Sequence, residues 1–150
     1  MSEPINPRVV DLSHWGPAHD YDAVKDAGIV GVIYKATQGI GFTDHTYVQQ
    51  QHAAKTAGLK WGAYHFADGS DLDRQVTNFL RFAAPDPDEL FCLDWEDNSG
   101  DTMSANGVKK WVWRSRQLSS RTARPFNVSI PARRTTTMPF TSQVRRGLMA

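Results

Sequence analysis

Two carboxylates, Asp94 and Glu96, are the residues whose type and spacing most directly suggest chemistry. They lie at the end of an apolar run, residues 89–95 (Glu-Leu-Phe-Cys-Leu-Asp-Trp), that is typical of a buried β-strand. Residues two apart on a strand point to the same face, so we expect these side chains to lie close together. Two carboxylates in a partly dry cleft cannot both ionise easily, which raises one pKa and makes that group a general acid. Cleavage of a glycosidic bond needs such a pair, although the spacing alone also fits a metal site or a solvated loop.

Polar residues also stand at the ends of three earlier apolar runs. Asp11 ends the first run, Lys35 and Thr37 follow the second, and Tyr64 and His65 lie in the third. In barrels and open parallel sheets, active sites form at the carboxyl ends of the strands. We therefore expect these side chains to share one edge of a sheet with the carboxylate pair.

The apolar runs alternate with amphipathic segments of helical period. The strand-like runs cover residues 9–13, 29–34, 59–66 and 89–95, and the helical segments cover 21–27 and 47–57 and begin again at Ser70 and at Ser104. The strands mostly start roughly 30 residues apart, about the length of one βαβ unit. Four such units predict a parallel α/β sheet, either a barrel or an open doubly wound sheet. No Gly-x-Gly-x-x-Gly follows the first strand, so we favour the barrel.

Four short motifs stand at the strand ends, within residues 8–113: Val10-Asp11-Leu12-Ser13-His14-Trp15, Tyr34-Lys35-Ala36-Thr37-Gln38-Gly39, Gly62-Ala63-Tyr64-His65-Phe66 and Leu93-Asp94-Trp95-Glu96. In order and spacing they resemble the motifs of the glycoside hydrolase family 25 muramidases, lysozymes of the Chalaropsis type that are common in bacteria and as phage endolysins. The resemblance implies an irregular, TIM-like β/α barrel. It also implies hydrolysis of the β-1,4 bond between N-acetylmuramic acid and N-acetylglucosamine in bacterial peptidoglycan, with no metal and no organic cofactor.

The resemblance also implies roles for single residues. Glu96 matches the family's general acid/base, and Asp94 matches the second carboxylate, which stabilises an oxocarbenium-like or oxazolinium-like intermediate. Asp11 matches the acidic residue that lines the cleft at the end of the first strand. Tyr64 matches a cleft tyrosine that contacts sugar, and Lys35 is a weaker polar neighbour.

Several residues near these motifs have a structural interpretation beside the functional one. We assign His65 to substrate binding rather than to catalysis, and the alternative is a histidine hydrogen-bonded within the strand. His14 and Trp15 fit sugar contacts and loop packing equally well. Cys92 lies in mid-strand, where a free cysteine is usually a small buried hydrophobe, so we assign it no chemistry.

Composition limits the class of protein. The chain has 150 residues, of which 40% are apolar and 22% are charged, as in an ordinary globular domain. A single cysteine excludes an internal disulfide framework, and no apolar stretch approaches the length of a membrane helix. The first residues show no secretory signal, so we expect a protein made in the cytoplasm that acts on the cell wall after release, without a membrane partner.

Charge divides the chain into two parts. Residues 1–100 carry 7 Lys and Arg against 15 Asp and Glu, whereas residues 101–150 carry 10 against 1. We therefore predict a muramidase-like part at 8–113 and a basic tail at 114–150 that is foreign to the family pattern or serves as an arm for anionic polymers. Only residues 126–130 in the tail resemble a strand, so the barrel is expected to be incomplete at its C-terminus. We expect no nucleic-acid partner, because few aromatic residues accompany the arginines.

Two other functions stay open from the sequence. One is a truncated, catalytically inactive muramidase fragment, which the unusual tail suggests. The other is a metal-dependent hydrolase with ligands from the set Asp11, His14, His65, Asp94 and Glu96. No His-x-His or His-Glu-x-x-His spacing supports the second.

Overall fold

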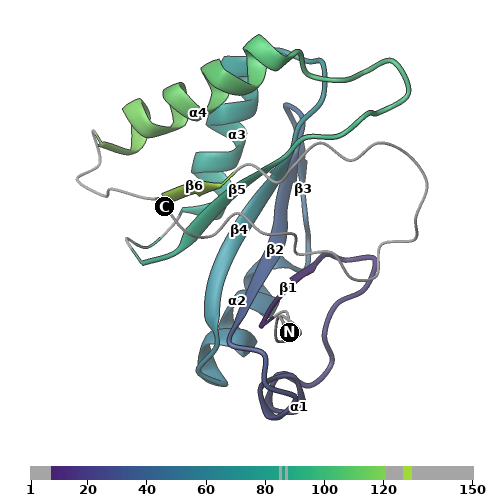
Figure 1. Ribbon diagram of the computed structural model, residues 1–150, viewed down its shortest axis with the longest axis vertical. Helices are drawn as coiled ribbons and strands as arrows, with labels where there is room; N and C mark the ends of the chain where they lie inside the picture. The colour runs from purple at the N-terminus through teal and green to yellow at the C-terminus, as the bar shows by residue number, and fades with distance from the viewer. Residues whose placement is uncertain (1–7, 85, 87, 121–126, 130–150) are drawn as a thin grey trace, which may run out of the picture.

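The computed structural model describes residues 8–84, 86, 88–120 and 127–129 (Figure 1). Its strands are β1 (Val9–Leu12), β2 (Gly31–Gln38), β3 (Phe42–Thr43), β4 (Lys60–Phe66), β5 (Leu90–Asp94) and β6 (Asn127–Ser129). Its helices are α1 (Tyr21–Asp26), α2 (Tyr47–Thr56), α3 (Leu72–Ala83) and α4 (Ala105–Ser120). No helix in this part of the chain is long and apolar enough to span a bilayer.

The strands form one sheet in the order β1-β2-β4-β5-β6, and every neighbouring pair in this order is parallel. A doubly wound sheet reverses its strand order near the middle, whereas a β/α barrel adds each parallel strand beside the last. The observed order is that of a barrel, which confirms the predicted fold class. Within the described residues the sheet is open, because β1 and β6 are its two edges and do not pair with each other.

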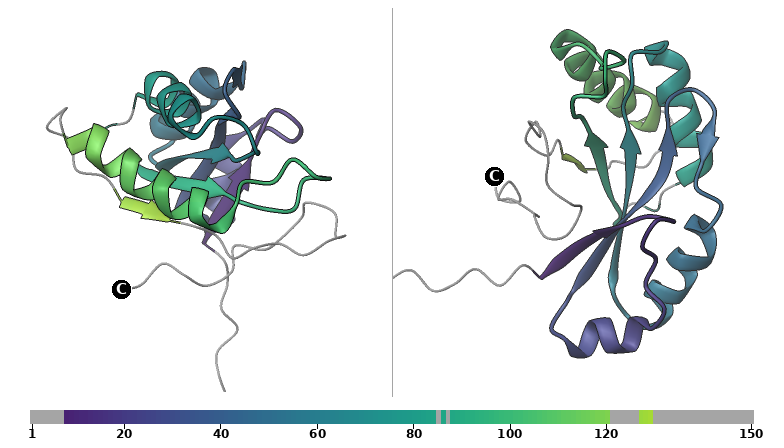
Figure 2. Two further views of the ribbon diagram at one scale, coloured as in Figure 1. Left: turned by 90° about the horizontal axis from the view of Figure 1, so that it is seen from above. Right: turned by 90° about the vertical axis from the view of Figure 1, so that its right-hand side faces the viewer.

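The helices cover one face of the sheet, which we call the helical face. Figure 2 shows α2 and α3 on the same side of the strands, and α4 packs beside α3. Two aromatic groups fill this layer: the Tyr34 ring stacks on Trp61 with centroids 5.7 Å apart, and Phe79 meets Phe91 edge to face at 4.8 Å. All four side chains are buried. Such aromatic burial contributes much of the packing free energy of a small domain.

Side-chain caps account for three of the four helix N-termini among the described residues. The Asp20 carboxylate accepts from the backbone N–H of Ala23 at the start of α1, and the Ser104 hydroxyl accepts from the N–H of Gly107 at the start of α4. At α3 the cap is Asp71, which accepts from the N–H of Arg74, and not the predicted Ser70. Ser70 instead donates to Asp68.

The observed second strand, β2, extends beyond the apolar run at 29–34 that predicts it, and the short strand β3 follows. β2 continues four residues beyond position 34: the pairing with β4 shifts register at a bulge between Lys35 and Thr37 and then resumes. The chain then reverses at Gly39, whose φ of +52° lies in the left-handed region, and pairs antiparallel as β3. The predicted strand at 126–130 is confirmed as β6, and residues 131–150 lie outside the described residues.

His65 belongs to the helical face. Its Nδ1 lies 2.7 Å from the Thr37 hydroxyl, its Nε2 lies 3.0 Å from Oε1 of Gln75, and its ring stacks on Trp111. The side chain is fully buried. Burial lowers the pKa of His65 from about 6.5 to about 4, against the opposing effect of the Gln75 hydrogen bond. The imidazole is therefore neutral in the folded protein near neutral pH.

This buried imidazole makes stability depend on pH. Below pH 6.5 the unfolded chain binds a proton at His65 that the folded protein does not bind until pH approaches 4, so the free energy of unfolding falls as pH falls. We expect His65 to account for a loss of about 2 kcal/mol between pH 6.5 and pH 5. Urea unfolding at a series of pH values measures this slope.

The matched variants are His65→Gln and His52→Gln, of which the second removes an exposed imidazole from α2. The first is expected to flatten the slope and the second to keep it. An unchanged slope in His65→Gln would contradict the assignment.

Candidate active site

The opposite face of the sheet, which we call the inner face, gathers polar side chains at the carboxyl ends of β1, β4 and β5. Tyr64 is buried there, and burial raises its pKa above the ordinary value of 10. The negative charges of Asp94 and Asp11 add to this rise, and the Ser13 hydroxyl opposes it by a hydrogen bond. Cys92 lies two residues before Asp94 on β5 and therefore on the same face. Burial raises the pKa of its thiol to about 12, and the same two carboxylates add to this rise. Asp11, Tyr64 and Asp94 therefore share one site.

Lys35 places a cation among these carboxylates. Its ammonium donates to Oε1 of Gln38 at 2.7 Å and lies over the rings of Phe66 and Phe42, 4.9 and 5.3 Å from their centroids. Burial lowers its pKa, and the charges of Asp94, Asp44 and Glu96 oppose that shift. Lys35 therefore interacts electrostatically with both members of the predicted carboxylate pair, Asp94 and Glu96.

Two contacts fix the chain just before Glu96. The backbone N–H of Ala67 donates to the carbonyl of Asp94 at 2.9 Å, which ties the end of β4 to the end of β5. The indole of Trp95 turns away from the pair, packs against the hydrophobic core and donates to the carbonyl of Met103 at 2.7 Å. Glu96 is half-buried. The two residues before it are thus held in place, which suits a group that must act at a defined position.

Asp44 is a site residue that sequence reasoning missed. It is fully buried between β3 and α2, and its Oδ1 accepts from the backbone N–H and the hydroxyl of Thr46 at 3.0 and 2.7 Å. Its Oδ2 accepts from the backbone N–H of His14 at 3.0 Å and lies 2.8 Å from the ring Nδ1 of the same residue. Burial opposes ionisation of Asp44, but these four contacts hold its pKa below the ordinary value. The carboxylate therefore joins the loop after β1 to the start of α2.

Four aromatic residues beside this carboxylate form what we call the aromatic rim: His14, Trp15, Phe42 and His45. The His14 ring lies 4.8 Å from Trp15, 5.6 Å from Phe42 and 5.7 Å from His45, centroid to centroid. Trp15 is 86% exposed and Phe42 is 41% exposed. Exposed rings next to a polar site offer flat apolar surfaces on which sugar rings can stack.

Of the six residues predicted for the site, the structure places Tyr64 and Asp94 on the inner face and couples Asp11 to Tyr64, and Lys35 to Asp94 and Glu96, through their charges. It does not bring His65 to them, because alternation along β4 turns that ring to the helical face beside Gln75. The metal-site alternative also depends on His65, which lies on the helical face and away from the other ligands proposed for the metal. Among the described residues, no group of three or more His, Cys, Asp or Glu side chains is arranged to hold a metal ion.

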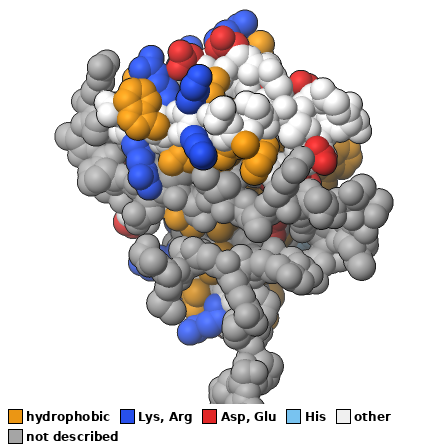
Figure 3. Space-filling view, turned by 45° about the horizontal axis from the view of Figure 1, so that its top comes forward, with side chains coloured by type: hydrophobic (Ala, Val, Ile, Leu, Met, Phe, Trp, Pro, Cys, Tyr) orange, Lys and Arg blue, Asp and Glu red, His pale blue; other side chains and the backbone are white. Residues whose placement is uncertain are grey.

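A basic surface covers α4. Lys109, Lys110 and Arg116 lie on its exposed side, and Trp113 beside them is 60% exposed. Figure 3 shows lysine and arginine side chains alternating with hydrophobic ones on this part of the molecule. The helix runs across position 113, where charge composition predicts a domain boundary, so the first residues of the predicted basic tail belong to the folded layer.

Asp44→Asn tests whether the buried carboxylate holds the site together. An amide at this position keeps one acceptor oxygen and turns an NH₂ group toward the His14 N–H, so we expect a loss of about 2 kcal/mol in the free energy of unfolding. Urea unfolding measures it. The control is Asp20→Asn, which keeps the helix cap and should change stability by less than about 0.5 kcal/mol. Equal effects of the two variants would show that Asp44 has no special role.

Comparisons with known proteins show which family the chain resembles. The sequence pattern of the family described as "Glycosyl hydrolases family 25" matches residues 10–125. The chain is 42% identical over 71 residues to an autolytic lysozyme of Clostridium acetobutylicum, a match that covers 47% of this chain and 22% of that protein. It is 38% identical over 58 residues to lysozyme M1 of Streptomyces globisporus, covering 39% of this chain and 20% of that one.

Solved structures of a lysozyme and a muramidase have a similar fold. The bacterial lysozyme from Streptomyces coelicolor superposes with a TM-score of 0.67 at 26% identity, over 85% of this chain and 64% of that one. A muramidase from Trichobolus zukalii superposes with a TM-score of 0.64 at 28% identity, over 79% and 62%. This chain thus covers about a fifth of the two curated lysozymes and less than two thirds of these two structures. Because the family pattern matches well over half of its 150 residues, the chain belongs to the glycosyl hydrolases of family 25.

Proposed function

We propose that the protein is a lysozyme-type glycoside hydrolase that cleaves the β-1,4 bond between N-acetylmuramic acid and N-acetylglucosamine in bacterial peptidoglycan. The observation that carries the proposal is the electrostatic coupling of Tyr64 to Asp94 and Asp11, and of Lys35 to Asp94 and Glu96, at the carboxyl ends of parallel strands. Family membership and the two related lysozymes support the substrate class. Action on the wall after release from the cytoplasm is part of the same proposal.

In this proposal Glu96 is the general acid and base. It gives a proton to the glycosidic oxygen as the bond to the anomeric carbon breaks, so that the leaving sugar departs as an alcohol. Asp94 is the second carboxylate, and its negative charge stabilises the positive charge that develops on the sugar ring. The two groups stand two residues apart at the end of β5, with Trp95 between them anchored to the core.

The neighbouring residues set the charge and the hydrogen bonding of the cleft. The raised pKa of Tyr64 keeps its phenol protonated, so it can donate a hydrogen bond to a sugar oxygen. Lys35 offsets part of the negative charge of the carboxylates, which otherwise repel one another. Asp11 extends the acidic surface along the cleft from β1. The aromatic rim supplies stacking surface for the glycan on the side of β3.

Glu96→Gln tests the proposal. Removing the proton donor while keeping the shape is expected to lower the rate of peptidoglycan hydrolysis at least about a hundredfold. The assay identifies the new reducing ends, and the parent protein should release muramic acid ends. The matched control is Asp88→Asn, which removes an exposed carboxylate just before β5 and should leave the rate unchanged.

Three outcomes would contradict the proposal, each in a different way. No release by the parent would identify an inactive fragment. Release of other ends would show that a different bond is cut. Loss of activity in excess EDTA would favour a metal-dependent hydrolase.

A further inference from the structure

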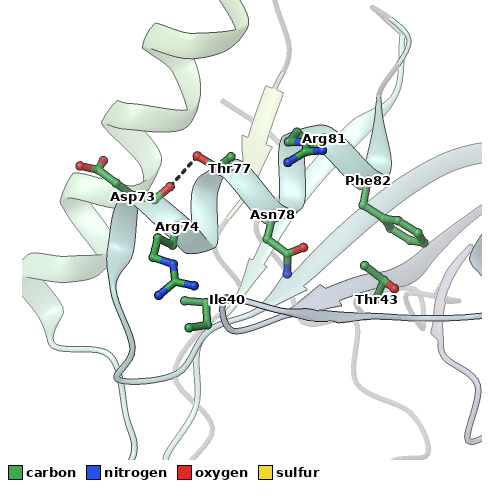
Figure 4. Close-up of a pocket in the computed structure, with 8 residues that line it drawn as sticks. All are labelled: Ile40, Thr43, Asp73, Arg74, Thr77, Asn78, Arg81 and Phe82. Carbon is green, nitrogen blue, oxygen red and sulfur yellow. Dashed lines mark hydrogen bonds between the residues drawn. The ribbon is translucent and has the colours of Figure 1, made fainter.

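A second concave surface lies outside the cleft, between α3 and the turn that joins β2 to β3. This groove has a volume of about 630 Å³ and is lined by residues of the turn (Ile40), of β3 (Thr43) and of α3 (Asp73, Arg74, Thr77, Asn78, Arg81 and Phe82). Figure 4 shows Arg74, Asn78 and Phe82 pointing from α3 toward the segment that carries Ile40 and Thr43. The groove therefore has a cationic side on the helix and an apolar contribution from Ile40 and Phe82.

The groove is positively charged in a part of the chain that is otherwise acidic. Arg74 and Arg81 are seven residues apart, which places them two turns apart on the same side of α3. In the part of the chain that the structure describes, neither guanidinium has a carboxylate within ion-pair distance. The one acid of the lining, Asp73, pairs with Arg114 of α4 at 3.0 Å. Two cations thus remain to meet a ligand.

The groove and the cleft share a wall. The side-chain amide of Asn78 donates to the carbonyls of Gly39 and Phe42 at 3.1 and 3.2 Å, which fixes the β2–β3 turn against α3. On the cleft side of this turn, the Phe42 ring lies under the ammonium of Lys35 and beside His14. On the other side, Ile40 lines the groove. A branch that leaves a glycan beside Phe42 would have to cross only this turn to enter the groove.

We propose that this groove binds the acidic peptide that branches from the muramic acid of peptidoglycan, an inference that rests on the proposed function. Its carboxylates match guanidinium groups, which bind carboxylates through two parallel hydrogen bonds. Its small alkyl side chains match the apolar surface of Ile40 and Phe82. A phosphodiester polymer of the wall offers the negative charges but no alkyl groups, so it would use only half of the lining.

Binding to insoluble peptidoglycan tests the inference without any need for turnover. Peptidoglycan freed of phosphodiester polymers is used with its peptides intact and after an amidase has removed them. Co-sedimentation is measured in the Glu96→Gln background, so that no glycan is cut. We expect Arg74→Gln/Arg81→Gln to weaken binding to the peptide-bearing material about tenfold and to leave binding to the stripped glycan unchanged.

The matched control is Lys109→Gln/Lys110→Gln, which removes the same charge from the exposed face of α4. It should keep the preference for peptide-bearing material. Equal weakening by the two double variants, or no preference in the background protein, would overturn the inference. Stronger binding to walls that carry phosphodiester polymers, abolished by the arginine variant, would assign the groove to those polymers instead. A failure of the proposed function appears separately, as absence of reducing ends from the protein with Glu96 intact.

Discussion

Side chains alternate between two faces along β4 and β5, and the candidate site depends on that alternation. His65, Phe91 and Leu93 are fully buried on the helical face, where α3 and α4 cover the sheet. One residue away along each strand, Tyr64 and Asp94 reach the inner face. A shift of one residue in strand pairing would exchange the two faces. The apolar packing that fixes the strands therefore also fixes which side chains meet in the cleft.

The loops at the carboxyl edge need a second support, because they lie beyond the strand pairing. The bulge at Ala36 and the buried carboxylate of Asp44 supply it: the backbone N–H of Asp44 donates to the carbonyl of Ala36, and its side chain holds His14 and Thr46. A buried carboxylate is stabilising only when its oxygens are satisfied, as they are here. The same contacts set the position of the aromatic rim, so one buried charge connects the fold to the surface that would meet the glycan.

Sequence reasoning identified the elements well and the long-range contacts poorly. The four strand ends and the carboxylate pair follow from apolar runs and from a spacing of two, which are local signals. Asp44 meets His14 across thirty positions, and no local pattern indicates such a contact. His65 stands beside Tyr64 at the end of a strand-like run, which indicates the cleft, but the sequence does not show which of two alternating sets faces it. In the structure both sets are buried at positions 61–65, so burial does not separate the two faces either. The short β3 had a signal, the Gly-Ile-Gly turn at 39–41, that could have predicted a reversal.

The central claim is that the carboxyl edge of the inner face holds the reacting glycan. A crystal structure of the Glu96→Gln variant with a peptide-free oligosaccharide of alternating N-acetylglucosamine and N-acetylmuramic acid tests it directly. The account predicts sugar rings against Tyr64 and the aromatic rim, with a glycosidic oxygen about 3 Å from the side chain at position 96. Sugar bound on the helical face, or a position 96 that no glycosidic oxygen approaches, would contradict it.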